Sequence, residues 1–279
     1  MKAVRKLYYA FSPSMRYVAR RLYYWPIDFY ETVFQKRDPM TPLKGMIFIG
    51  AGDFKKQGEH LLDLVIKYAG LKPDGRILDI GCGIGRLAIP LTRYLNAKGQ
   101  YEGFDIVKMG IDWCNKKIAV KYSNFHFLYV DLKNDLYNLN TESEAKFFQF
   151  PYPQSSFDCI VLTSVFTHMM PNDVDNYLKQ ISLVMNDNAK CLATFFLLNT
   201  KIKRQIADDK IEFKFSHHFD GYSLMDKKVK EANVAYDEEF LLSMLRKNGL
   251  CVESIHQGSW SKGSSPLDFQ DVVIIKKNS

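Results

Sequence analysis

Three glycines follow an aspartate in segment 79–85 of this chain, which reads DIGCGIG. The segment directly follows the apolar run Arg76–Ile80, which we predict to be a buried strand. Glycines let such a strand turn sharply into a helix while its backbone approaches a ligand, because no Cβ is in the way. The start of the following helix offers free N–H groups to an anion. The segment therefore predicts a binding loop for a nucleotide-like ligand.

The spacing of the glycines narrows the kind of ligand. Gly81, Gly83 and Gly85 alternate, whereas a nicotinamide-binding loop follows the pattern G-x-G-x-x-G. Asp79 stands two residues before the first glycine, where it could reach an amino group. Asp105 ends the next predicted strand, where a carboxylate can accept hydrogen bonds from both hydroxyls of a ribose. The alternatives are structural, because either carboxylate could instead cap the end of a helix or strand.

Four segments resemble the class I S-adenosylmethionine (SAM) dependent methyltransferases. They read RILDIGCGIGR (76–86), YEGFDI (101–106), VDL (130–132) and FDCIVLTSVFTH (157–168), and the resemblance covers roughly residues 45–279. It implies SAM as the cofactor and an α/β, Rossmann-like fold. The implied seven-stranded sheet has the order 3-2-1-4-5-7-6, with the seventh strand antiparallel and helices on both faces. The candidate cofactor-binding residues are Asp79, Gly81, Cys82, Gly83, Gly85, Asp105, Ile106, Asp131, Leu132 and Thr163.

The resemblance gives these residues different roles. Ile106 packs on the adenine, and Asp131 stands at the strand end that meets the adenine. Acidic residues are also common at strand ends without a ligand, so a structural role is the alternative for Asp131. Cys82 is expected to fill space in the loop and not to act as a nucleophile. The family's usual Pro-Gly-Gly turn before the fifth strand is replaced by residues 186–188 (NDN), which can turn by other means.

Methyl transfer needs a base only if the acceptor must lose a proton. His168, with Thr167 beside it, follows the fourth predicted strand, where ligands gather in open α/β sheets. Histidine titrates near neutral pH, so His168 is the candidate catalytic residue. A structural hydrogen bond at a helix start is its alternative role. His217, His218 and Tyr222 could line an acceptor pocket or belong to a solvated loop. We expect no metal site.

The acceptor is less constrained than the cofactor. The fourth predicted strand does not end in the Asn/Asp-Pro-Pro-Tyr run of enzymes that methylate nucleobase amino groups, and no cysteine follows a proline, as cytosine C5 enzymes require. Segments 50–54, 258–260 and 270–273 resemble a bacterial subgroup that works on glycans or natural products. We therefore expect a hydroxyl group of a sugar, glycolipid or small metabolite as the acceptor. The alternatives are a SAM-binding scaffold without transfer activity and a nucleotide-cofactor (nicotinamide) oxidoreductase.

Alternating strands and helices must position these residues. We predict further strands at 101–104, 125–130, 157–164, 189–198, 250–256 and 271–276. We predict helices at 54–69, 86–95, 108–121, 172–185 and 237–249. Such alternation favours a mostly parallel sheet with helices on both faces. Residues 199–236 break the rhythm and are predicted to form an acceptor-side insertion within a domain of residues 45–279.

Residues 1–44 are predicted to form a separate basic and aromatic arm, with one or two short helices broken at prolines 13, 26, 39 and 42. Residues 1–40 carry +5 of the chain's formal net charge of +7, and charge confined to an arm disfavours nucleic acid as the partner. The arm could cover an edge of the main domain, close over the acceptor, or contact anionic lipid as a peripheral membrane segment. Five widely spaced cysteines without a C-x-x-C pair favour a cytoplasmic protein.

Overall fold

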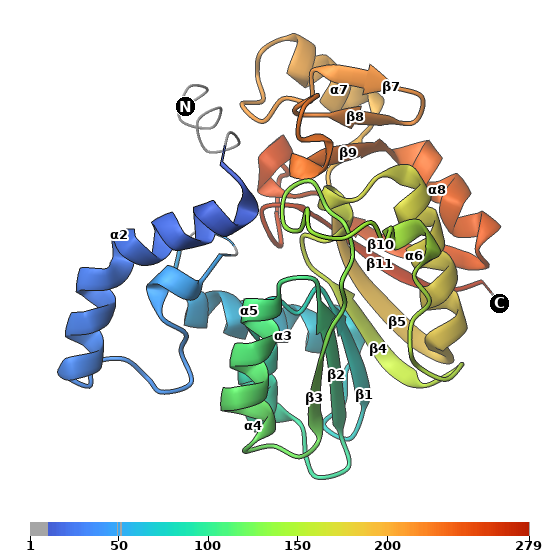
Figure 1. Cartoon of the computed structure of the whole chain (residues 1–279). Helices are drawn as coiled ribbons and strands as arrows, with labels where there is room; N and C mark the ends of the chain where they lie inside the picture. Colours follow the sequence, from blue (N-terminus) through green and yellow to red (C-terminus); the bar gives the residue numbers. More distant parts are fainter. Residues whose placement is uncertain (1–10, 49, 51, 279) are drawn as a thin grey trace.

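The computed structural model describes residues 11–48, 50 and 52–278, and within these residues seven strands form one sheet of order β10-β11-β5-β4-β1-β2-β3 (Figure 1). The strands are β1 (Arg76–Ile80), β2 (Gln100–Asp105), β3 (Phe125–Tyr129), β4 (Phe157–Leu162), β5 (Met185–Phe195), β10 (Leu250–His256) and β11 (Asp271–Lys277). The pairs among β1 to β5 are parallel, and β11 pairs antiparallel with both β5 and β10. This order confirms the predicted fold and its antiparallel seventh strand.

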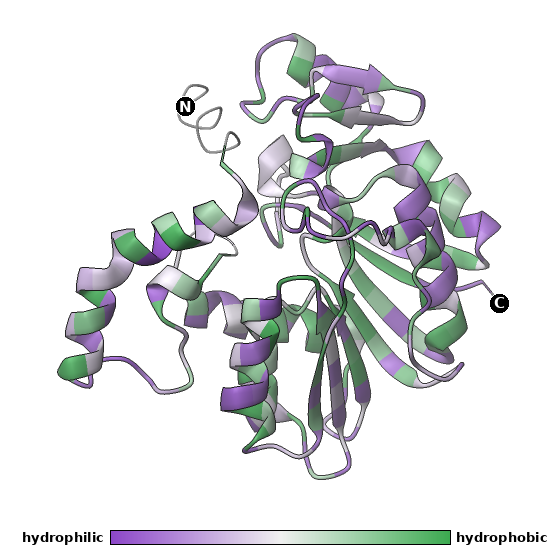
Figure 2. Cartoon of the chain, in the orientation of Figure 1, coloured by the Kyte–Doolittle hydropathy of each residue, from purple (hydrophilic) through white to green (hydrophobic). Residues whose placement is uncertain are grey.

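Helices cover both faces of the sheet, because alternate residues of the central strands need an apolar partner on each side. On β1, Ile77 packs into the same apolar cluster as helices α3, α4 and α5, whereas Leu78 and Ile80 pack into the cluster that contains α6 and α8. The hydropathy colours show this apolar interior along the strands (Figure 2). The helices are α3 (Phe54–Ala69), α4 (Ala88–Tyr94), α5 (Lys108–Cys114), α6 (Pro171–Val184) and α8 (Glu238–Lys247).

Two local expectations differ from the structure. The helix predicted over residues 108–121 is α-helical only to Cys114, after which Asn115–Ala119 forms a π-helical turn. Residues 186–188 were predicted to form the turn before the fifth strand, but they lie inside β5. The register with β4 shifts there, from Phe157 opposite Met185 to Cys159 opposite Lys190. A bulge therefore takes up the extra residues that the expected turn would have used.

The predicted insertion, 199–236, carries secondary structure of its own. It holds helix α7 (Thr200–Ala207) and the hairpin of β7 (His217–Phe219) and β8 (Tyr222–Leu224). These strands join β6 (Leu197–Leu198) and β9 (Val234–Asp237) in a second sheet of order β6-β9-β8-β7. A separate apolar cluster includes Leu198 of β6 and Ala235 of β9, together with Phe196, Phe215 and Trp260. The domain boundaries stay predictions.

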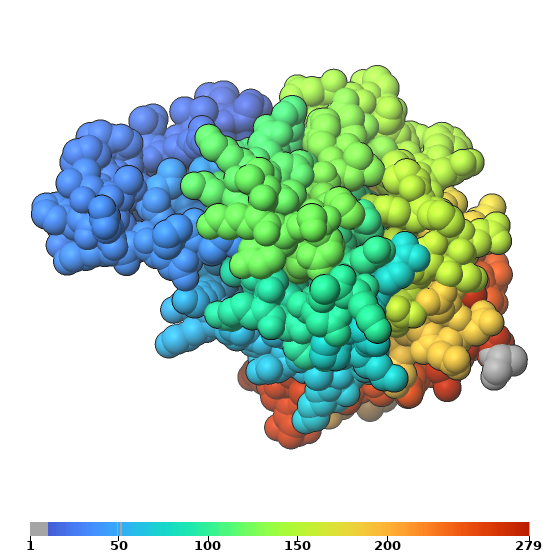
Figure 3. Space-filling model, turned by 90° about the horizontal axis from the view of Figure 1, so that it is seen from below, coloured from blue at the N-terminus to red at the C-terminus, as the bar shows by residue number. Residues whose placement is uncertain are grey.

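Among the described residues of the arm, 11–44, one long helix, α2 (Pro13–Val33), spans 21 residues. The predicted break at Pro26 is wrong, because Pro26 lies inside this helix, which continues to Val33 although proline has no N–H to donate. Asp28 fixes the helix to the 3₁₀ turn η1 (Lys44–Met46): its carboxylate accepts from the backbone N–H groups of Lys44 at 2.7 Å and Gly45 at 2.9 Å. The arm stands out from the rest of the chain (Figures 1 and 3). Within the described residues no helix is both long enough and apolar enough to span a membrane.

Candidate functional site

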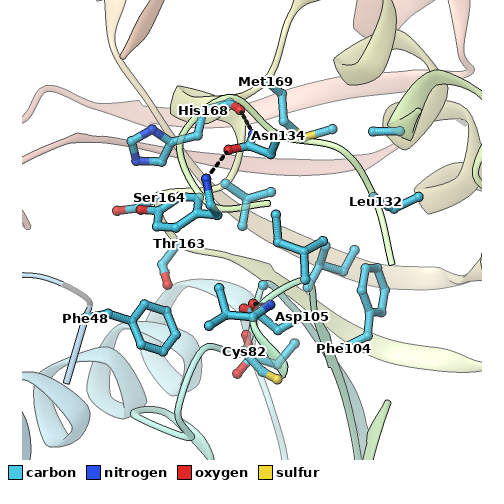
Figure 4. Close-up of a pocket in the computed structure, with 18 of the residues that line it drawn as sticks. Phe48, Cys82, Phe104, Asp105, Leu132, Asn134, Thr163, Ser164, His168 and Met169 are labelled. Carbon is cyan, nitrogen blue, oxygen red and sulfur yellow. Dashed lines mark hydrogen bonds between the residues drawn. The ribbon is translucent and has the colours of Figure 1, made fainter. Parts of the chain in front are cut away.

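A cavity of about 220 Å³ opens at the carboxyl ends of β1, β2 and β4, the edge where ligands bind in open α/β sheets. Figure 4 places His168 and Asn134 at one end of the cavity and Cys82 and Asp105 at the other. The cavity thus joins the predicted cofactor loop to the predicted base. Among the candidate residues, it is lined by Asp79, Gly81, Cys82, Asp105, Ile106, Leu132, Thr163 and His168.

The loop after β1 makes a close turn that only glycine accommodates at position 81. Gly81 has a φ of +74°, and a Cβ built there would lie 2.3 Å from Cγ2 of Val165. The N–H groups of Gly81 and Cys82 donate to the carbonyl oxygen of Phe104 at 2.8 and 3.1 Å, which ties the loop to β2. The backbone therefore runs along the cavity wall without a side chain between it and a ligand.

Asp105 holds the same loop from the end of β2. Its Oδ2 accepts from the N–H of Gly83 and its Oδ1 from the N–H of Val107, each at 2.7 Å. Each carboxylate oxygen has a further lone pair, so both can still accept from ribose hydroxyls. Burial raises the pKa of Asp105 to about 6, although the backbone hydrogen bonds oppose that rise. Asp105 thus holds the loop in place, and its carboxylate oxygens can also bind the ribose of a ligand.

Asp79 is a buried carboxyl group, 3% exposed, whose Oδ2 accepts from the hydroxyl of Tyr101 at 2.8 Å. Burial raises its pKa to about 7, and the charge of Asp105 adds to the rise. No backbone N–H among the described residues donates to Asp79, so the helix-capping alternative has no support. The charge of Arg86 opposes the rise in pKa only in part, so a ligand ammonium group beside Asp79 would further favour its charged form.

Three predicted cofactor residues do not line the cavity. Gly83 and Gly85 lie in the loop but outside the cavity lining, and they allow its turn through positive φ values of 60° and 79°. Asp131 is exposed, and its Oδ1 accepts from the hydroxyl of Tyr129 at 2.9 Å and the amide of Asn138 at 2.8 Å. The adenine contact of Asp131 stays a prediction that the cavity lining does not support.

His168 lies in the 3₁₀ turn η4 (Phe166–His168), just beyond β4. Its Nδ1 bonds the carbonyl oxygen of Glu231 at 2.9 Å. A carbonyl only accepts, so Nδ1 carries the hydrogen and Nε2 of the neutral ring keeps a lone pair. Burial lowers the pKa of His168, and hydrogen bonds with the backbone of Glu231 and Ala232 oppose part of this lowering. The amide of Asn134 donates to the carbonyl oxygen of His168 at 2.9 Å and holds the turn (Figure 4).

Glu231 is a cavity residue that the sequence did not suggest. It lies in the 3₁₀ turn η5 (Lys230–Ala232) of the insertion, and its Oε2 accepts from the N–H of Asp135 at 2.6 Å. Burial raises its pKa to about 8, so the carboxyl group is mostly protonated at neutral pH. No motif marks this position, because only the fold of the insertion brings it to the cavity.

The other candidates from the insertion lie elsewhere. His217, His218 and Tyr222 do not line the cavity; they belong to the β7–β8 hairpin, where Nδ1 of His218 bonds Oγ of Ser223 at 3.0 Å. Thr167, which the sequence placed beside the base, is fully buried and outside the cavity lining. Arg86 lines the cavity, and its place directly after the glycine loop was a usable sequence indication.

A family model described as a methyltransferase domain matches residues 54–255, which is more than half of the chain. The match spans the glycine loop, both buried carboxylates and the turn that carries His168. The chain belongs to the class I SAM-dependent methyltransferases. SAM is the cofactor of this family, and the observed cavity agrees with that assignment.

The chain residues fit SAM by their chemistry. The buried carboxyl of Asp79 suits the ammonium group of the methionine moiety, and Gly81 leaves room for that moiety beside it. Asp105 suits the ribose hydroxyls, and Ile106 and Leu132 give an apolar wall for the adenine. Within the described residues no group of three or more His, Cys, Asp or Glu side chains could hold a metal ion.

Relatives of this chain include proteins named 2-phytyl-1,4-naphtoquinone methyltransferase. The one from Trichormus variabilis is 25% identical over 140 residues, a match that covers 50% of this chain and 55% of the relative. The one from Synechococcus elongatus is 43% identical over 42 residues, 15% of this chain and 18% of the relative. The chain thus spans about half the length of the first curated relative and less of the second.

Solved structures share the fold of this chain. A protein of Pyrococcus horikoshii has a TM-score of 0.55 at 14% identity, covering 88% of this chain and 98% of that one. The magnesium protoporphyrin IX methyltransferase of Synechocystis, with bound SAH, has a TM-score of 0.51 at 14% identity, covering 90% and 98%. At such low identity the likeness concerns the fold alone.

Proposed function

We propose that this protein transfers a methyl group from SAM to a hydroxyl group of a small acceptor, with His168 as the general base. The observation that carries the proposal is the neutral imidazole of His168 in the wall of the cofactor cavity, held through Nδ1. When bound, SAM supplies a methyl group on a sulfonium and takes up the electron pair of the broken carbon–sulfur bond. The chain must therefore position the acceptor and take its proton.

His168 performs the proton step at one defined atom. The hydroxyl proton of the acceptor passes to Nε2, because Nδ1 already carries a hydrogen that donates to Glu231. Burial disfavours the imidazolium, so the ring is neutral and ready to accept a proton at pH 7. The side-chain amide of Asn134 donates to the backbone carbonyl of His168 and keeps the turn that carries the imidazole in place.

Space for an acceptor lies beside His168. A second cavity of about 240 Å³ is lined by His168, Tyr137 and Phe48, which also line the first cavity, and by Arg20 of α2. The protonated carboxyl of Glu231 offers an O–H donor to an oxygen of the acceptor. These polar groups favour an oxygen-bearing acceptor, which a sugar, a glycolipid or a small hydroxylated metabolite would provide.

The named relatives support a small-molecule acceptor. By their names, these relatives act on 2-phytyl-1,4-naphtoquinone, which is a small molecule. The glycan alternative rests on the sequence resemblance to the bacterial subgroup alone. We propose a small metabolite as the first candidate acceptor for this chain and a glycan as the second.

Transfer of tritium from methyl-labelled SAM to fractions of a cell extract tests the function. We expect label in an ether that resists amide and ester cleavage, and we expect His168→Gln to lose the transfer while it still binds SAM. Saturating SAM binding without any labelled product would favour the scaffold alternative. Label on nitrogen would overturn the hydroxyl acceptor, and NADH binding without SAM binding would favour an oxidoreductase.

We also propose a cytoplasmic location for the protein. All five cysteines are free thiols, which supports a reducing compartment. Fractionation of cells that express the full chain should place it in the cytoplasm or on the cytoplasmic side of a membrane, and recovery from an oxidising compartment would contradict the proposal.

A further inference from the structure

One face of α2 carries exposed apolar side chains along its whole length. Their spacing of three or four residues places them on one side of the helix, and each is 53–70% exposed. Soluble helices normally bury such a stripe against a core. We call this set the α2 stripe, and its members are Met15, Val18, Leu22, Trp25, Phe29 and Val33.

The opposite side of α2 faces the rest of the chain. Arg16 and Asp28 are buried there, each 7% exposed, and Asp28 accepts from the backbone of η1. A Cβ at Gly45 would lie 3.0 Å from Cα of Arg21, so the two segments are in close contact. These contacts fix the rotation of α2, and they leave the α2 stripe exposed on the other side of the helix.

The surroundings of the α2 stripe are aromatic and positively charged. Trp25 stacks on Phe29 with ring centroids 5.5 Å apart, and Tyr30 accepts a hydrogen bond from Nζ of Lys36 at 2.7 Å. Arg21 is exposed along the edge of the stripe. Tryptophan and tyrosine prefer the headgroup level of a bilayer, and basic side chains there bind anionic lipid.

The acidic side chains of α2 do not offset this charge. The carboxylate of Asp28 is buried at η1, and Glu31 forms an ion pair with Lys44. A second copy of the chain would bring two positively charged arms together, whereas an anionic surface attracts them. The chemistry of the face thus matches an anionic lipid surface better than another copy.

We propose that the α2 stripe docks this protein on the surface of an anionic lipid bilayer, with α2 lying in the plane of the interface. An amphipathic helix with an apolar face and basic flanks binds in this way. The apolar side chains enter the boundary between headgroups and acyl chains, and Arg21 and Lys36 contact the headgroups. The docking does not depend on the identity of the methyl acceptor.

Co-sedimentation of the full chain with phosphatidylcholine vesicles, with and without phosphatidylglycerol, tests the docking. We expect binding to the anionic vesicles, weakened by salt. The triple variant Leu22→Ser, Trp25→Ser, Phe29→Ser should bind at least about tenfold more weakly, because its apolar contact area is lost. A matched variant with Val120→Ser, Leu139→Ser and Phe147→Ser, all exposed outside the arm, should bind like the unaltered chain.

Two charge reversals test the docking independently. Arg21→Glu together with Lys36→Glu should reduce binding to anionic vesicles and remove most of its salt dependence. Failure of the unaltered chain to bind anionic vesicles, or equal binding by the stripe variant, would overturn the proposal. So would a dimer in sedimentation velocity that the stripe variant converts to a monomer. SAM affinity, measured for every variant, separates lost docking from lost folding and from failure of the proposed function.

Discussion

The imidazole of His168 donates from Nδ1 to the main-chain carbonyl oxygen of Glu231 at 2.9 Å. This contact joins the turn after β4 to the insertion, two segments 63 residues apart in the chain. It fixes the tautomer of the ring, and it also brings the carboxyl group of Glu231 to the cavity. The base and a hydrogen-bond donor for the acceptor are therefore positioned by one local arrangement.

Replacing His168 by glutamine should lower kcat by about 10²–10⁴, the usual contribution of a general base, because an amide cannot take a proton. SAM affinity should stay unchanged. With the unaltered chain, kcat should fall on acidification, with a midpoint below that of an exposed histidine, since burial lowers the pKa of His168. His126→Gln, at an exposed histidine that pairs with Glu102, is the matched control. Normal turnover by His168→Gln would remove His168 from catalysis.

SAM binding should depend on the protonation of Asp79. The pKa of this carboxyl is about 7 without a ligand, and an ammonium partner favours its charged form. SAM affinity should therefore fall as the pH drops below about 7, and binding there should release a proton. Calorimetry in buffers of different ionisation enthalpy measures the proton directly. Asp79→Asn should weaken binding at alkaline pH and flatten the pH dependence, and an unchanged pH profile would contradict the role of Asp79.

The same carboxyl should make the ligand-free protein less stable as the pH rises. The pKa of Asp79 in the folded state, about 7, lies above its ordinary value of 3.8, so the folded state binds more protons between these limits. The free energy of unfolding then falls as the pH rises through this window. Asp105, with a pKa of about 6, acts in the same direction. Urea denaturation at several pH values should show that the free energy of unfolding falls less with rising pH for Asp79→Asn than for the unaltered chain. The same pH dependence for both proteins would contradict this role of Asp79.

Asp105→Ala should weaken SAM binding by about 1–3 kcal/mol, the range for leaving polar groups unpaired. The change removes the acceptor for Gly83 and Val107 as well as the acceptor for the ribose. Asp131→Ala is the informative comparison, because Asp131 lies outside the cavity lining. Titration calorimetry should find little change for Asp131→Ala. A loss equal to that of Asp105→Ala would instead support the adenine contact of Asp131.

Gly81→Ala should destabilise the cofactor loop for two reasons that can be separated. Its φ of +74° is unfavourable for alanine, and the added Cβ would meet Val165 at 2.3 Å. Gly70→Ala carries a similar strain, at a φ of +70°, with no atom within 4 Å of the Cβ. It should cost only about 1–2 kcal/mol. Adding Val165→Ala should recover part of the stability lost in Gly81→Ala but leave Gly70→Ala unaffected. Equal losses for both glycines would contradict the close contact.

Sequence patterns correctly predicted the features that depend on residues close together in the chain. The strand before Gly81 and the acids at positions 79 and 105 lie where the spacing placed them, because a strand–loop–helix turn constrains its own residues. The bulge in β5 and the long helix through Pro26 were missed, since pairing with β4 and packing on η1 outweigh local turn preferences.

The amino-acid sequence by itself determined the cofactor loop, the order of the sheet through family resemblance, and His168 as the candidate base. The tertiary structure alone brought Glu231 to His168, left Asp131 outside the cavity lining, and turned the apolar side of α2 outward. The reason is physical: glycine conformation and strand alternation act within a few residues. The position of an insertion or an arm depends on contacts such as that of Asp28 with Gly45, which link distant parts of the chain.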